Sequence, residues 1–200
     1  MNIPNLLTVV RVVLIPIFVL IYLLPFNWVY LVASIIFAIA CITDWFDGYL
    51  ARQWNQTTPF GAFLDPVADK LIVAVALVLL VGSHSRVIQG TMVNLCLTLS
   101  AIIIVGREIV VSALREWMAE LGARTNVAVS KLGKWKTAAQ MLALIILLAN
   151  PPKLTTWVIT GYILLGIAAI LTIWSMIHYL MAAWPYLTSE KTTKNEQTDK

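Results

Sequence analysis

Long apolar stretches, separated by short polar or turn-forming segments, dominate the chain. Several of them approach or exceed the roughly 20 residues that an α-helix needs to cross a hydrocarbon core about 30 Å thick. Apolar content and helix-breaking residues divide the sequence into six expected spans. They cover residues 6–24, 28–48, 66–82, 91–118, 133–149 and 155–182. The pattern therefore predicts an all-α integral membrane protein with six transmembrane helices.

The breaks between the spans contain proline, glycine and asparagine, which end or interrupt helices. These breaks lie at residues 25–27, 53–59, 82–90, 122–126 and 150–152. After Leu187 the sequence turns polar, with lysines among threonine, glutamate and glutamine, a composition typical of disorder. We therefore expect one membrane domain over residues 1–187 and a disordered cytosolic tail over residues 188–200.

Composition agrees with a bilayer environment, because 60% of the residues are hydrophobic and only 12% are charged, far from the usage of soluble proteins. Cys41 and Cys96 lie in apolar runs without the spacing of metal ligands, so neither a disulfide nor a zinc site is indicated. The formal net charge is +4, but the basic residues lie between apolar spans and no base-stacking module accompanies them. A nucleic-acid partner is not expected.

The distribution of basic residues predicts the orientation of the chain. If the N-terminus is cytosolic, every lysine and arginine except Arg86 and Lys153 falls on the cytosolic side. Cytosolic segments of membrane proteins are enriched in these residues. We therefore expect a multi-pass protein of the cell (plasma) membrane with both termini in the cytosol, where all ten acidic residues would also lie.

Four of the acidic residues lie within one short window, at Asp44, Asp47, Asp65 and Asp69. The first two are three residues apart and the last two are four apart, so on helices each pair projects from one face. The first pair ends the second span and the other pair opens the third. The connecting loop from Gln53 to Leu64 would then bring both pairs to one side of the membrane, in a polar active-site cavity that faces the cytosol.

Four negative charges at the edge of a low-dielectric slab repel one another, so a bound cation must neutralise them if all are ionised. All-oxygen ligation favours Mg²⁺ or Mn²⁺ over zinc, and two such ions about 4 Å apart suit in-line displacement at phosphorus. Gly48 and Gly61 would let a phosphate approach the backbone closely. Ala51 keeps the next turn narrow, and Arg52 offers a planar fork for phosphate oxygens. The cluster therefore indicates phosphoryl-group chemistry with two divalent cations.

The motif that begins at Asp44 resembles the signature of the CDP-alcohol phosphatidyltransferase family. It reads Asp44-Trp-Phe-Asp47-Gly48-Tyr-Leu-Ala51-Arg52, eight residues, Gly61, three residues, Asp65, three residues and Asp69. The family transfers a substituted phosphate from a CDP-linked donor, usually CDP-diacylglycerol, to an alcohol and releases CMP. The resemblance implies that the four aspartates ligate two metals and that Asp69 is also the general base. It further implies a CDP-binding set of Gly48, Ala51, Arg52 and Gly61.

A second set of basic residues bears on the acceptor. Arg107 lies in an otherwise apolar span, where a charge is costly, so we expect it to face a polar cavity and a partner. Glu108 is a candidate partner, although it points about 100° away around the helix. Lys131 and Lys134 share one face at the start of the fifth span. This set suits an anionic acceptor; the alternative is that it only enforces topology and contacts lipid phosphates. For Lys136 the topological role is the expected one.

Two stretches around these residues, 107–116 and 130–137, resemble the phosphatidylglycerophosphate synthase branch of the family more than its inositol or serine branches. That resemblance implies sn-glycerol 3-phosphate as the acceptor, with its phosphate on Arg107, Lys131 and Lys134. The opening Asn5-Leu-Leu-Thr8-Val-Val-Arg11 also resembles the family, so these three polar residues are expected to close the nucleotide pocket. Otherwise Asn5 is a helix cap and Arg11 an interfacial anchor. The family likeness also implies a homodimer.

Two alternatives stay open at this point. The same chemistry with another acceptor, namely phosphatidylglycerol, inositol phosphate or serine, would need only a different acceptor pocket. An ion or solute transporter is the more distant alternative, because carboxylates within membrane spans often mark ion paths. It is disfavoured because the outer halves of the spans carry almost no polar groups.

Overall fold

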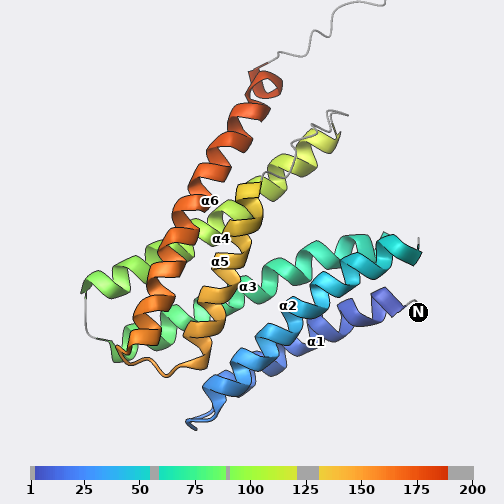
Figure 1. The fold of residues 1–200 in the computed structure, drawn as a ribbon. Coiled ribbons are helices and arrows are strands. Elements are labelled where there is room, and N and C mark those ends of the chain that lie inside the picture. Colours follow the sequence, from blue (N-terminus) through green and yellow to red (C-terminus); the bar gives the residue numbers. More distant parts are fainter. Residues whose placement is uncertain (1–2, 55–58, 89–90, 121–130, 189–200) are drawn as a thin grey trace, which may run out of the picture.

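The computed structural model describes residues 3–54, 59–88, 91–120 and 131–188. Helices account for nearly all of this part of the chain, which contains no strand. They are α1 (Ile3–Tyr22), α2 (Val29–Trp54), α3 (Pro59–Val87), α4 (Thr91–Glu120), α5 (Lys131–Ala149) and α6 (Thr156–Thr188), as Figure 1 shows. Each expected span corresponds to one of these helices, so the all-α prediction is confirmed.

The break predicted at residues 82–90 is wrong over most of its length, because α3 continues through Gly82 to Val87. Two polar side chains of this segment interact with a backbone carbonyl oxygen of the same helix. Ser83 Oγ donates a hydrogen bond to the carbonyl oxygen of Leu80 at 3.2 Å, and His84 Nδ1 lies 3.0 Å from the same oxygen. His84, which lies within the predicted break, is fully buried. Polar sequence therefore does not end this helix.

The loop expected from Gln53 to Leu64 is also shorter than predicted. Helix α2 continues to Trp54 and α3 begins at Pro59, so Asp65 lies inside a helix rather than at its start. Proline suits the first helical position, because the N–H that it lacks would have no partner within the helix. The two aspartates of α3 consequently stand on regular helix.

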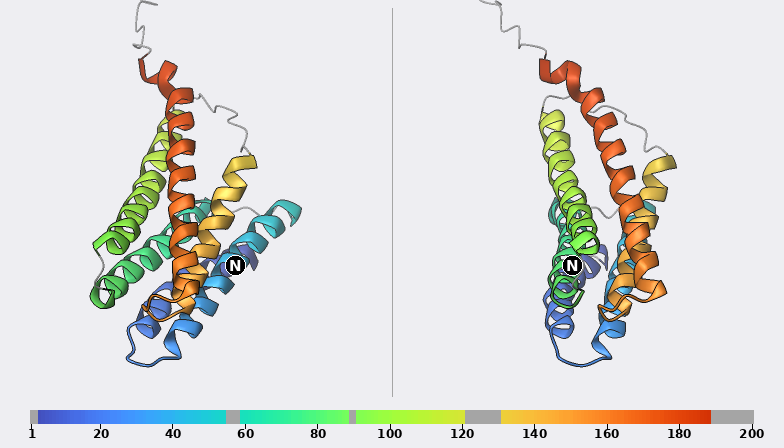
Figure 2. Two further views of the ribbon diagram at one scale, coloured as in Figure 1. Left: turned by 60° about the vertical axis from the view of Figure 1, so that its left-hand side comes forward. Right: turned by 90° about the vertical axis from the view of Figure 1, so that its left-hand side faces the viewer.

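Helix α3 holds the bundle together, since it contacts α1, α2, α4 and α5. On one side α1 and α2 form a hairpin, and on the other α6 packs against both α4 and α5 (Figure 2). The turns between α1 and α2 and between α5 and α6 lie at one end of the bundle, and the start of α1 and the end of α6 point to the other (Figure 1). We call this second end the polar end.

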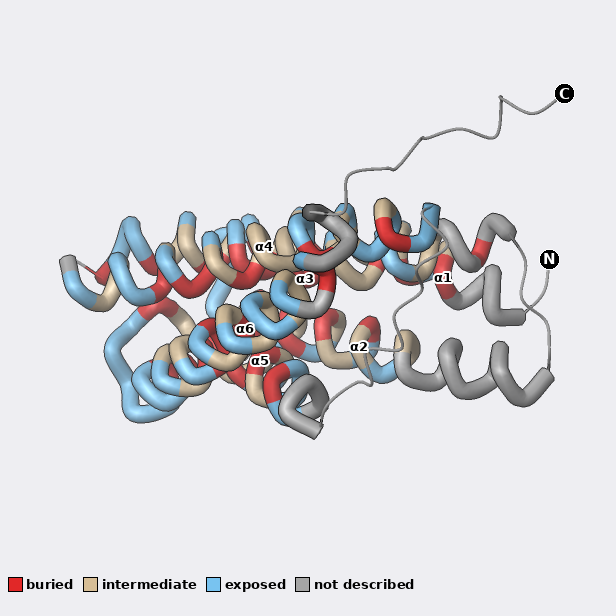
Figure 3. The backbone as a smooth tube through the Cα atoms, turned by 90° about the horizontal axis from the view of Figure 1, so that it is seen from above, coloured by how far each residue is buried: buried red, intermediate tan, exposed pale blue. Residues whose placement is uncertain are grey.

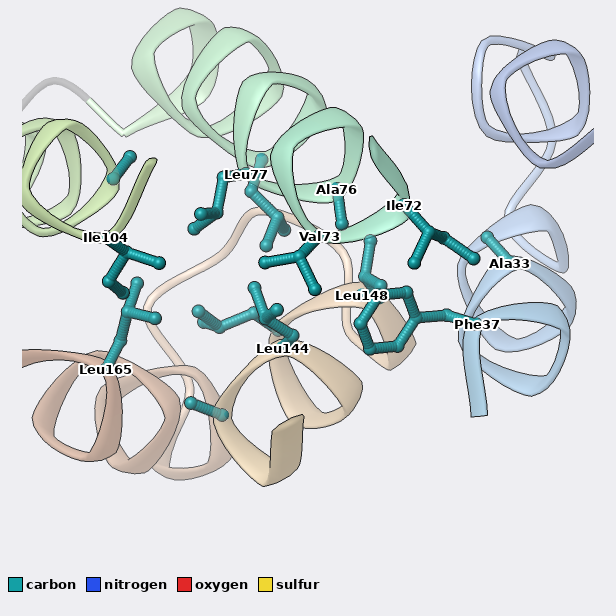
Figure 4. Packing of buried hydrophobic residues seen from close by; sticks show 14 of the residues in the cluster. Ala33, Phe37, Ile72, Val73, Ala76, Leu77, Ile104, Leu144, Leu148 and Leu165 are labelled. Carbon is teal, nitrogen blue, oxygen red and sulfur yellow. The ribbon is translucent and has the colours of Figure 1, made fainter. Parts of the chain in front are cut away.

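The core combines aliphatic and aromatic side chains from all the described helices. Figure 4 shows Phe37 of α2 beside Ile72 of α3 and Leu148 of α5, while Ile104 of α4 faces Leu165 of α6. The outward surface is apolar as well, and exposed positions run along every helix (Figure 3). Examples are Leu20, Ile35, Val78, Ile102, Leu142 and Ile170. Helices that are apolar on all sides are typical of a bilayer.

Two helices contain stretches that are long and apolar enough to cross a membrane, Met92–Glu120 in α4 and Thr156–Met181 in α6. Three shorter apolar stretches lie at Thr8–Tyr22, Val29–Asp44 and Trp135–Ala149. Together with the apolar outer surface, these stretches are the features of a membrane protein.

Candidate active site

The polar end of the bundle carries the aspartates that the sequence singles out. Asp44 lies near the end of α2, and Asp65 and Asp69 lie near the start of α3, which contacts α2. The two aspartates of α3 are four residues apart and so project from one helix face. Asp47 follows on α2, but its side chain lies outside the described residues.

Helix α1 binds one carboxylate from each of the two pairs. Thr8 Oγ1 donates a hydrogen bond to Asp65 Oδ1 at 2.5 Å, and Arg11 Nη1 donates to Asp44 Oδ1 at 2.6 Å. Thr8 and Arg11 are both 1% exposed, and their spacing of three places them on the same face of α1. Arg11 is therefore not the interfacial anchor considered as an alternative, and both residues belong to the aspartate cluster.

Asp69 lies between this cluster and a second group of charges. Among charged groups, Asp44 and Arg11 act on it most strongly, and Glu108 and Lys70 also act on it. The carboxylate is only partly exposed. Charges of both clusters therefore act on one partly exposed carboxylate, and its role as the base stays a prediction.

The oxygen donors at this end are of the kind that Mg²⁺ and Mn²⁺ prefer. Within the described side chains, no three acidic, histidine or cysteine residues lie close enough together to hold a metal as they stand. One oxygen of Asp44 and one of Asp65 are already hydrogen-bonded to α1. The carboxylate oxygens thus fit divalent cations as ligands. That all four carboxylates converge on one site stays a prediction.

A second polar cluster joins α4, α5 and α6. Arg107 Nη1 donates to Glu108 Oε1 at 2.6 Å, and Lys136 Nζ lies 3.5 Å from the same oxygen. Arg107 Nη2 donates to Ser175 Oγ at 3.4 Å. The two cationic side chains are largely buried, 14% and 5% exposed. Two cations from different helices therefore converge on one anionic oxygen, as they would on an acceptor phosphate.

Lys136 is a member of this cluster that sequence reasoning did not select, whereas Glu108 was considered as the partner of Arg107. Lys136 was expected to serve topology, but it is buried and paired. Glu108 lies about 100° around the helix from Arg107, yet the long arginine side chain spans that angle. The signal that could have found Lys136 is the acid beside an arginine in an apolar span, because buried charges require partners.

Lys70 of α3 reaches across to α4, beside the basic cluster. Its Nζ donates to Ser112 Oγ of α4, and that hydroxyl donates to the carbonyl oxygen of Glu108 at 2.6 Å. Lys70 follows Asp69 in the sequence, and Glu108 of the basic cluster also acts electrostatically on Asp69, so the candidate base lies near that cluster.

The remaining predicted residues lie on helices at the polar end. Gly61 is buried in the first turns of α3. The side chains of the others lie outside the described residues, and these are Asn5 on α1, Ala51 and Arg52 with Gly48 on α2, and Lys131 and Lys134 on α5. Their predicted roles are therefore untested by the geometry.

Comparison of the sequence with known proteins identifies the family of this chain. Residues 1–177 match the sequence model of the CDP-alcohol phosphatidyltransferase family. A protein of Pseudomonas fluorescens named CDP-diacylglycerol--glycerol-3-phosphate 3-phosphatidyltransferase is 64% identical over 193 residues, covering 95% of this chain and 94% of its own. A protein of Escherichia coli K12 with the same name is 55% identical over 183 residues, covering 91% of this chain and 94% of its own.

Proposed function

The chain belongs to the CDP-alcohol phosphatidyltransferase family, and from this premise we propose that it transfers the phosphatidyl group from CDP-diacylglycerol to sn-glycerol 3-phosphate. The products are phosphatidylglycerophosphate and CMP, and the reaction is a step of phospholipid biosynthesis. One structural observation supports this most directly. An aspartate cluster and a buried pair of cations, Arg107 and Lys136, lie close enough that Glu108, the partner of both cations, also acts electrostatically on Asp69.

The donor side of the site is assigned to the aspartate cluster. Asp44, Asp47, Asp65 and Asp69 would hold two divalent cations, Mg²⁺ or Mn²⁺, which when bound offset the charge of the pyrophosphate and of the departing CMP. The family motif assigns the nucleotide and pyrophosphate to Gly48, Ala51, Arg52 and Gly61, with Asn5, Thr8 and Arg11 closing the pocket from α1. The buried positions of Thr8 and Arg11 support that assignment.

The acceptor side is assigned to the basic cluster. The acceptor phosphate would lie on Arg107, Lys131 and Lys134, and Lys136 adds a further buried cation beside Arg107. Asp69 takes the proton of the 1-hydroxyl as that oxygen attacks the phosphorus of the phosphatidyl group. The bond from this phosphorus to the CMP oxygen breaks in the same direct step, so no covalent enzyme intermediate forms.

The whole chain would cross the membrane six times, with both termini and the site on the cytosolic side of the cell membrane. Helix lengths support this, because even α5, with 19 residues, extends about 28 Å at 1.5 Å per residue, close to a hydrocarbon core of about 30 Å. Residues 1–187 would form the membrane domain and the protein would act as a homodimer. The tail predicted over residues 188–200 lies, beyond Thr188, outside the described residues.

The test is turnover by the purified chain in detergent with Mg²⁺ or Mn²⁺. With CDP-diacylglycerol and an equimolar mixture of glycerol 3-phosphate, phosphatidylglycerol, inositol phosphate and serine, mass spectrometry should find phosphatidylglycerophosphate as the main lipid product. A different main lipid product would show that the enzyme prefers another acceptor. No CMP release with any acceptor would reject the enzyme and favour the transporter alternative.

A further inference from the structure

Arg11 places a permanent cation inside the aspartate cluster. Its side chain is 1% exposed, and its Nη1 lies 2.6 Å from Asp44 Oδ1. A guanidinium stays protonated at physiological pH, and a buried charge without a partner is strongly destabilising. Arg11 and Asp44 therefore stabilise each other as long as both remain in place.

Asp44 is also one of the carboxylates assigned to the divalent cations. Its side chain is 40% exposed, so an ion can reach it from the water while Arg11 contacts it from within the protein. A carboxylate that accepts a charge-assisted hydrogen bond is a poorer ligand for a second cation. The positive charge of Arg11 also repels any ion bound a few ångströms away.

The charges balance differently once the site is filled. Two divalent cations would neutralise four carboxylates, so the charge of Arg11 would remain in excess. The pyrophosphate of the donor is anionic and would offset this excess. Without metal, Arg11 instead reduces the repulsion between Asp44 and Asp69, whose charges act on each other.

From this arrangement we propose that Arg11 is a built-in counter-cation of the aspartate cluster. It stabilises the cluster when no metal is bound and weakens divalent-cation binding until an anionic donor arrives, so that metal and donor bind tightly only together. This inference rests on the proposed metal-dependent function. It differs from a role in which Arg11 only binds the donor phosphate, because it predicts an effect on metal binding when no donor is present.

The experiment measures Mn²⁺ binding to the purified full chain without substrate, by calorimetry or electron paramagnetic resonance. Arg11→Met removes the charge, and Mn²⁺ should then bind about tenfold more tightly, the size of effect expected of a charge within a few ångströms. The metal-free variant should also unfold at a lower temperature than wild type, and Mn²⁺ should stabilise it more. Arg11→Lys keeps the charge and should bind Mn²⁺ within about threefold of wild type.

Two further variants keep the outcome clear. Arg11→Gln retains a hydrogen-bond donor for Asp44 without the charge, should also bind Mn²⁺ more tightly, and decides the matter if the Met variant does not fold. Arg86→Met, on an exposed side chain at the far end of α3, should change nothing. Unchanged or weaker Mn²⁺ binding in the uncharged Arg11 variants would overturn the inference alone, whereas a wild-type chain that binds no Mn²⁺ would overturn the proposed metal site as well.

Discussion

At the scale of single residues, Asp69 has the most demanding assignment, because it is both a proposed metal ligand and the proposed base. Its charged surroundings come from three other helices, with Arg11 on α1, Asp44 on α2 and Glu108 on α4. A side chain that only ligated metal would need no such proximity to the basic cluster. Its two roles can be separated by substitution.

Asp69→Asn should reduce CMP release about 10²- to 10⁴-fold, the usual contribution of general-base catalysis. The amide cannot accept the proton, but three carboxylates remain, so Mn²⁺-dependent binding of CDP-diacylglycerol should persist. Both quantities are measured on the same purified sample. Glu116→Gln, an exposed position on α4, is the control. Loss of Mn²⁺ binding together with turnover would show that Asp69 is mainly a ligand.

Arg107→Gln should raise the KM for glycerol 3-phosphate about 10- to 100-fold, because a hydrogen bond to a charged group contributes roughly 1.5–3 kcal/mol. The KM for CDP-diacylglycerol should change far less, and Lys134→Gln should act in the same direction. Steady-state kinetics with each substrate varied in turn measures the difference. Lys153→Gln, exposed at the opposite end, is the control. Equal increases in KM for both substrates would indicate that Arg107 contacts lipid or supports folding.

At the scale of helices, the contact between α5 and α6 depends on a residue without a side chain. A Cβ atom added at Gly161 would lie 2.7 Å from both Cγ and Cδ2 of Leu147. Leu147 is fully buried, so it has little room to move. A Cβ at Gly166, five residues further along α6, would meet nothing within 4 Å.

Gly161→Ala should therefore destabilise the protein by about 1–3 kcal/mol, the usual range for overpacking a core. Gly166→Ala should leave stability unchanged or raise it by up to about 1 kcal/mol, because alanine favours a helix over glycine. Thermal unfolding in one detergent compares the two variants. Equal stability would mean that α5 and α6 can separate at this point without cost.

The order and type of the helices could be predicted because apolar length alone decides them, whereas side-chain partners depend on which faces meet. Helix α3 was cut short at Gly82 because the sequence does not show that Ser83 and His84 bond to the helix backbone. Lys136 was predicted to serve only membrane topology because its side-chain partner could not be read from the sequence. Its partner, Glu108, lies on another helix, and only packing brings the two together.

At the scale of the whole molecule, the two ends of the bundle differ in charge. Lys153, in the turn between α5 and α6, and Arg86 are exposed at one end, and the aspartate and basic clusters occupy the other. This division agrees with the orientation expected from the positive-inside rule. The sidedness can be tested without any enzymatic assay.

In a background where Cys41 and Cys96 are replaced by serine, Lys153→Cys should react with a membrane-impermeant maleimide in intact cells. Glu120→Cys, at the exposed end of α4, should react only after the cells are permeabilised. Labelling of Glu120→Cys in intact cells would reverse the orientation and place the site outside. Labelling of both would show mixed insertion.

The bond between Arg11 and Asp44 also bears on how the chain enters the bilayer during synthesis. The ribosome completes α1 before α2, and a lone guanidinium is expensive in lipid. Asp44 lies 33 residues later, so the partner becomes available only when most of α2 has been made. Joint entry of α1 and α2 as a closed hairpin therefore costs less than entry one after the other. The contact that holds the site in the mature protein thus also favours a particular order of assembly.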